Sequence, residues 1–86
     1  MNYQFRDFEI PEYMMAGLLR YIEHGIPPGS FLEAVLENDL KAAVGRADDI
    51  NMRNIPAYIG YLYNEAPRGC WGSPKIVEAW INQKRG

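Results

Sequence analysis

The chain has 86 residues, of which 48% are hydrophobic and 23% charged, so we expect one globular helical domain over residues 1–86 and exclude a disordered charged tail. A net charge of −2 without a basic stripe argues against nucleic acid as a partner. The single cysteine, Cys70, excludes an intramolecular disulfide, and no apolar run is long enough for a membrane span, so we expect a protein of a reducing, intracellular compartment that has no membrane partner.

The first expected elements are a short extended arm and a helix. Residues 3–9 alternate loosely between apolar and polar side chains, which favours an extended arm, although a strand there would need a partner. Pro11 suits the first turn of a helix, and apolar side chains then recur at helical spacing as far as His24. Gly25 can adopt the left-handed conformation that ends a helix. The first helix is therefore predicted over residues 11–24.

A proline turn leads directly into the second expected helix. The Ser30 hydroxyl is expected to accept a hydrogen bond from a backbone N–H, and the Glu33 carboxylate is expected to reach back to the Ser30 N–H, which is the capping-box arrangement. The pattern predicts a helix over residues 31–44, with a stop or bend at Gly45. Its apolar face consists of Leu32, Val35, Leu36, Leu40, Ala43 and Val44.

The second half of the chain predicts two further helices. Pro56 is tolerable only in the first turn of a helix, so the third helix is expected to begin between residues 48 and 55, preferably within 51–54, and to end near residues 64–65. The following loop carries Trp71 among two glycines and two prolines, either as an anchor or as a ligand contact. Ser73 is expected to cap the fourth helix, which holds Pro74 in its first turn and ends near Gln83.

These elements predict an all-α fold. We expect a small irregular or orthogonal bundle of about four helices with a short extended N-terminal arm. Regular coiled-coil packing is not expected, because each helix is short and the proline-rich joints determine the angles between helices.

A search for chemistry in the sequence gives no catalytic motif. There is no phosphate-binding glycine loop, nucleophile elbow, metal-binding histidine pair or cysteine–histidine couple. His24 falls in the last turn of the first helix, where a structural or exposed role is expected, and Cys70 is expected to be a small buried apolar residue. We therefore predict a protein that is not an enzyme and has no metal, cofactor or catalytic residue.

The sequence is rich in tyrosine and tryptophan, and the third expected helix cannot bury all of its tyrosines. One interpretation is an aromatic-rich core. The other is a partner-binding patch made of Tyr61, Tyr63, Arg68 and Trp71, since such residues are enriched at protein interfaces. An alternative ligand site would use Arg46, Arg53 and Arg68 to hold a nucleotide-like molecule between the subunits of a homo-oligomer.

Several stretches resemble a group of small phage and prophage proteins that has no established activity. They are residues 10–25 (IPEYMMAGLLRYIEHG), 27–40 (PPGSFLEAVLENDL), 46–49 (RADD), 62–67 (LYNEAP) and 69–74 (GCWGSP). The resemblance implies a phage origin and the host cytoplasm, and it transfers no functional residue. Small phage proteins without enzymatic motifs commonly bind a host protein. The expected function is therefore to modulate or inhibit a host protein, including a restriction or CRISPR defence complex.

Overall fold

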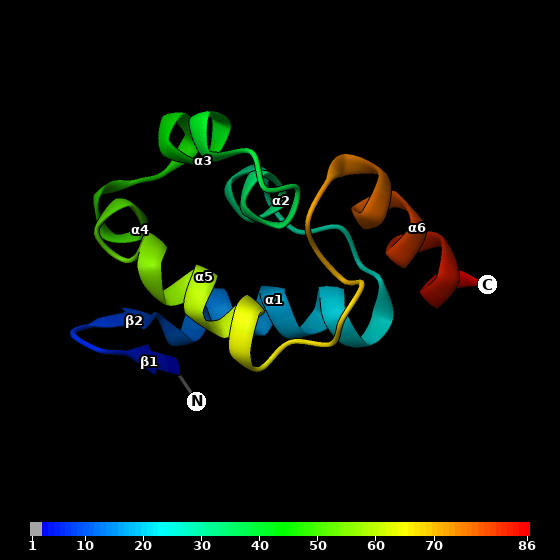
Figure 1. The fold of residues 1–86 in the computed structure, drawn as a ribbon, viewed down its shortest axis with the longest axis horizontal. Coiled ribbons are helices and arrows are strands. Elements are labelled where there is room, and N and C mark those ends of the chain that lie inside the picture. Colours follow the sequence, from blue (N-terminus) through cyan, green and yellow to red (C-terminus); the bar gives the residue numbers. More distant parts are fainter. Residues whose placement is uncertain (1–2) are drawn as a thin grey trace.

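The computed structural model describes residues 3–86, and most of them are helical. An antiparallel hairpin precedes a series of short helices, and Figure 1 shows α6 and α4 at opposite ends of the long axis of the molecule. The elements within residues 3–86 are β1 (Tyr3–Phe5), β2 (Phe8–Ile10), α1 (Glu12–His24), α2 (Ser30–Leu36), α3 (Leu40–Arg46), α4 (Asp49–Arg53), α5 (Ile55–Asn64) and α6 (Pro74–Arg85).

The N-terminal arm is a hairpin, so the fold is not purely all-α. Tyr3 pairs with Ile10 and Phe5 with Phe8, and the partner that a strand at residues 3–5 requires is thus the chain immediately after it. The hairpin lies along α5 (Figure 1), where the Phe5 ring covers Gly60. Two strands of this length are marginal by themselves, and packing against α5 supplies the missing stabilisation.

The first helix is confirmed at nearly its predicted bounds. Gly25 has a φ of 67° and its N–H donates to the Tyr21 carbonyl at 2.9 Å, so it ends α1 as expected. A Cβ at Gly25 would lie 2.6 Å from the Cβ of Lys84, because the end of α1 packs directly against α6. The Trp80 indole N–H donates to the carbonyls of Tyr21 and Ile22, both at 3.2 Å, and this contact joins the same two helices.

The predicted helix over residues 31–44 is wrong, because the chain forms α2 and α3 in its place. Asn38 adopts a φ of 60° and breaks the helix, and the Asp39 carboxylate then caps α3 by accepting from the Ala42 N–H at 3.1 Å. The break turns the predicted apolar face away from the core at two positions. Leu40 is 66% exposed and Val44 is also exposed, whereas Ala43 remains buried.

The predicted capping box is also wrong. Ser30 is the first residue of α2 and makes no capping hydrogen bond, because Gly29 occupies the N-cap position in an extended conformation. Glu33 instead lies 4.0 Å from the guanidinium of Arg46, on α3. The chain therefore enters α2 from the Pro-Pro-Gly turn without a side-chain cap.

The prediction of a single third helix that begins within 51–54 is wrong, because the chain forms α4, which begins at Asp49, and α5, which begins at Ile55. The Asp48 carboxylate accepts from the Asn51 N–H at 2.7 Å and caps α4, and Pro56 lies in the first turn of α5 as expected. The end of α5 at Asn64 is confirmed. The Ser73 hydroxyl caps α6 by accepting from the Ile76 N–H at 3.2 Å, also as expected, and α6 continues to Arg85, slightly beyond its predicted end.

The core draws buried side chains from β2, α1, α2, α3, α5, α6 and the loop before α6. Tyr21 and Tyr58 are its largest fully buried members, and the Phe31 ring meets Tyr58 edge to face at 5.2 Å. Some of the tyrosines therefore belong to the core, which agrees with the interpretation of an aromatic-rich core. No helix within residues 3–86 combines the length and the apolar character needed to cross a bilayer.

Candidate interaction groove

The loop between α5 and α6 is held to the core on both sides of Trp71. The Tyr21 hydroxyl donates to the Cys70 carbonyl at 2.7 Å, and the Gly72 N–H donates to the Leu36 carbonyl at 2.8 Å. The Cys70 side chain is fully buried, and this burial raises the pKa of its thiol. Because its two neighbours are fixed in this way, Trp71 is held in a defined position.

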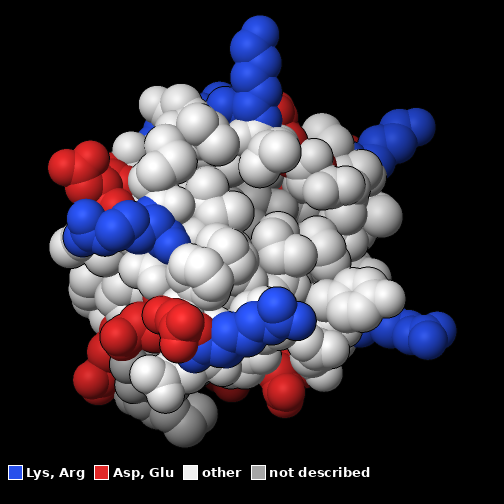
Figure 2. Space-filling model, turned by 60° about the vertical axis from the view of Figure 1, so that its left-hand side comes forward, with Lys and Arg blue, Asp and Glu red and all other residues white. Residues whose placement is uncertain are grey.

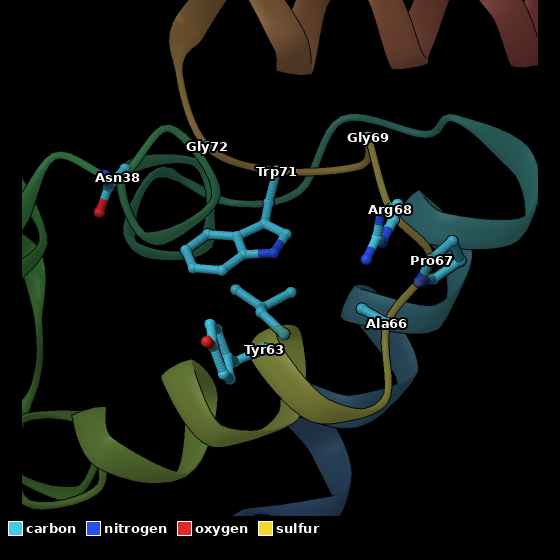
Figure 3. A pocket seen from close by; sticks show the side chains of 9 residues that line it. Asn38, Tyr63, Ala66, Pro67, Arg68, Gly69, Trp71 and Gly72 are labelled. Atoms are coloured by element: carbon cyan, nitrogen blue, oxygen red, sulfur yellow. The ribbon is translucent and has the colours of Figure 1, made fainter.

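Trp71 lines an open groove with a volume of about 570 Å³. Figure 3 shows the groove between the last turn of α5, the loop before α6 and the turn between α2 and α3. Its lining is Asn38, Leu62, Tyr63, Ala66, Pro67, Arg68, Gly69, Trp71 and Gly72.

The groove combines two accessible aromatic rings with one cation. Tyr63 is 81% exposed and Trp71 is half-buried, so both rings have surface left to cover. Arg68 is exposed and makes no hydrogen bond or ion pair with any part of residues 3–86, and the Trp71 indole N–H likewise has no acceptor there. In Figure 3 the nitrogen-bearing edge of the indole is turned toward Arg68. The groove thus presents apolar surface beside unused hydrogen-bond donors.

Three of the four residues predicted for partner binding line this groove, and Tyr61 does not. The Tyr61 ring packs edge to face against Tyr3 at 5.2 Å, so it anchors the N-terminal hairpin. Burial raises the pKa of the Tyr61 hydroxyl, with a smaller contribution from the charge of Glu65.

Asn38 lines the groove from a distant part of the chain, and it was not among the residues predicted from the sequence. It enters the groove because its left-handed conformation turns the chain between α2 and α3. Asparagine tolerates this conformation better than most residues, so the Asn38-Asp39 pair inside an apolar pattern was the available signal for a break followed by a cap.

The alternative ligand residues do not gather at the groove. Only Arg68 lines it. The Arg46 guanidinium donates to the Ser30 carbonyl at 3.2 Å, which ties α3 to the start of α2. Arg53 is exposed in the last turn of α4. A nucleotide phosphate bound beside Trp71 would therefore meet one arginine from this chain.

Other reactive side chains are dispersed. His24 is exposed and lies 3.9 Å from the Glu23 carboxylate. Within residues 3–86, no group of three or more histidine, cysteine or acidic side chains is arranged to hold a metal ion. A second groove of about 360 Å³ lies between α1 and the start of α2, and Tyr13 and Arg20 are among its lining residues.

Apolar side chains continue from the groove toward α3 and the start of α5. Leu40 and Ile59 are exposed and line a small apolar depression that shares Asn38 with the groove. On the side where α3 and α4 come forward, Figure 2 shows a broad uncharged area with basic and acidic side chains at its margins. The groove thus adjoins a mostly apolar depression, in which Asp39 is the one charged lining residue.

Comparisons with protein-family models, with curated proteins and with solved structures find no match.

Proposed function

We propose that this chain is a small phage-encoded, non-enzymatic protein that binds a host protein in the host cytoplasm and modulates or inhibits it. Components of restriction or CRISPR defence are the candidate targets. The observation that carries the proposal is that Tyr63, near the end of α5, lines one groove together with Arg68 and Trp71, which lie on the following loop that is held to the core. Tryptophan, tyrosine and arginine are the residue types that dominate binding energy at protein interfaces.

The rigidity of the loop supports this function. A binding loop that is ordered before it meets its partner loses less conformational entropy on association, so more of the contact energy appears as affinity. The hydrogen bonds on both sides of Trp71 provide this order without using a side chain of the groove. The adjoining apolar side chains Leu40 and Ile59 extend the surface available to a partner.

Affinity purification from host lysate tests the proposal. The Trp71→Ala/Tyr63→Ala double variant is expected to retain less than about a tenth of the specific partner captured by the native chain, because truncated aromatic hot spots typically cost more than tenfold in affinity. Tyr13→Ala is the matched control, since Tyr13 is an exposed tyrosine on α1 outside the groove. Equal capture by the native chain and the double variant would contradict the proposal.

The alternative function, sequestration of a nucleotide-like molecule by a homo-oligomer, requires basic side chains beside the aromatic ones. Arg68 meets this requirement, whereas Arg46 and Arg53 lie outside the groove. Native mass spectrometry of the purified chain distinguishes the two functions. We expect the mass of the chain alone, and an oligomer that retains a nucleotide would favour the alternative.

A further inference from the structure

The charge of the groove indicates the chemistry of its occupant. Arg68 is the only charged residue of the lining, and the nine lining residues include no aspartate or glutamate. Glu65 directly precedes the lining residue Ala66 but does not itself line the groove, and its charge acts on the hydroxyl of Tyr61. Arg68 also has no counter-ion within residues 3–86.

An arginine in this setting is suited to a carboxylate. The planar guanidinium can donate two parallel hydrogen bonds to a carboxylate, and such charge-assisted bonds are about twice as strong as neutral ones. The unused indole N–H of Trp71 faces the same space in Figure 3 and offers a further donor. A multiply charged phosphate fits less well, because the groove lining holds a single cation, which matches the single charge of a carboxylate.

The two aromatic rings of the groove indicate that its occupant also carries an apolar side chain. Trp71 is half-buried and Tyr63 almost fully exposed, so an apolar side chain placed against them would remove aromatic surface from water. The donors and the rings belong to the same groove, which means that one short segment of a partner would reach both.

We propose that the groove binds an acidic segment of a partner protein, in which an aspartate or glutamate pairs with Arg68 and an adjacent aliphatic or aromatic side chain covers Trp71 and Tyr63. This inference rests on the proposed function and specifies the partner's chemistry. The carboxylate provides specificity and orientation, and the apolar side chain provides most of the buried area.

Selection from a library of random heptapeptides displayed on yeast tests the inference, with the complete 86-residue chain as the immobilised binder. The native chain is expected to enrich peptides with an acidic residue within about two positions of an apolar one, the reach of a short extended segment. Arg68→Glu is expected to replace the acidic preference by lysine or arginine. Arg85→Glu is the matched control, because Arg85 is an exposed arginine at the end of α6 outside the groove, and it is expected to enrich the same acidic peptides as the native chain.

The most enriched peptide is synthesised and its binding is measured by tryptophan fluorescence, which gives the contribution of the pair between Arg68 and the carboxylate to affinity. Replacing its carboxylate by the corresponding amide, or Arg68 by glutamine, is expected to weaken binding about tenfold, the effect of losing a charge-assisted pair. Millimolar AMP is expected to leave the peptide bound. Displacement by AMP, a peptide pool without acidic preference, or the same acidic pool with Arg68→Glu would overturn the inference.

The two proposals fail separately. If Trp71→Ala/Tyr63→Ala abolishes capture of the host protein while the peptides show no acidic preference, the proposed function stands and the acidic specificity falls. If acidic peptides are enriched and depend on Arg68, but the double variant captures the host protein normally, the groove binds acidic segments and the proposed function of the groove falls.

Discussion

The Tyr58 hydroxyl donates a 2.6 Å hydrogen bond to Oδ1 of Asn51, and both side chains are buried. Asn51 is the one polar residue that is buried within residues 3–86, and its Nδ2 lies 4.0 Å from the sulfur of Met14. The pair joins α4 to α5 across the bend at Asn54. It shows how a polar group is accommodated where the chain changes direction inside the core.

Tyr58→Phe is expected to lower the free energy of unfolding by about 1–2 kcal/mol, because it leaves the buried Asn51 carbonyl oxygen without its donor. Urea denaturation followed by circular dichroism measures this change. Tyr13→Phe is the control and is expected to change stability by less than about 0.5 kcal/mol, since Tyr13 is 61% exposed. If Tyr58→Phe were as stable as the native chain, the hydrogen bond would not contribute to stability.

Helix caps give a comparison among three positions. Ser73→Ala and Asp48→Ala each remove a side chain that accepts from a backbone N–H, and each is expected to cost about 1 kcal/mol. Ser30→Ala removes no capping bond, and it is expected to stay within about 0.5 kcal/mol of the native stability. Thermal unfolding of the three variants distinguishes these effects. A loss at Ser30 equal to that at Ser73 would restore the capping box that the sequence predicted.

Two helical glycines are expected to respond to alanine with opposite signs. A Cβ at Gly60 would lie 2.6 Å from Cδ1 of Phe5, so Gly60→Ala must displace the hairpin and is expected to cost about 1–3 kcal/mol. A Cβ at Gly45, in α3, meets nothing within 4 Å, and Gly45→Ala is expected to stabilise the protein by about 0.5–1 kcal/mol through the higher helix propensity of alanine. Chemical denaturation of both variants tests the signs, and stabilisation by Gly60→Ala would show that the hairpin is not packed on α5.

Local signals in the sequence were sufficient to predict where a helix begins or ends when a single residue determines the backbone conformation at that point. Gly25 ends α1 because glycine accepts a positive φ, and Ser73 with Pro74 starts α6 because a hydroxyl acceptor and a fixed φ suit the first turn. The break at Asn38 was missed because the apolar pattern continues through it. The hairpin was missed because strands of three residues have almost no periodicity, and their stability depends on the distant Gly60.

The candidate site was predictable to the extent that its residues are neighbours in sequence. Tyr63, Arg68 and Trp71 fall within one turn of helix and its following loop, so they were expected together. Asn38 joins them only through a contact between distant segments, the Gly72 N–H bound to the Leu36 carbonyl. Tyr61 was separated from them because it contacts the hairpin, which the sequence did not predict as paired strands.

Alkaline pH is expected to destabilise the protein through its buried hydroxyls and thiol. Burial raises the pKa of Tyr21 and Tyr58 above their ordinary value of 10.0, and it raises the pKa of Cys70 above its ordinary value of 9.0. Below about pH 8 these groups are protonated in both the folded and the unfolded chain, and their contribution to stability is complete. As the pH rises further, the unfolded chain releases its protons first, so the free energy of unfolding falls.

Melting temperatures measured from pH 7 to pH 10.5 test this expectation. A constant value up to about pH 8 followed by a decline is expected for the native chain, and Tyr58→Phe is expected to decline less steeply above pH 10 because it lacks one group that the fold keeps protonated. Tyr63→Phe is the control and is expected to follow the native profile, since Tyr63 is 81% exposed and its charge does not contribute to the raised pKa of Tyr58. Identical slopes for the native chain and Tyr58→Phe would show that the buried Tyr58 hydroxyl does not couple folding to pH, even though its hydrogen bond to Asn51 is present.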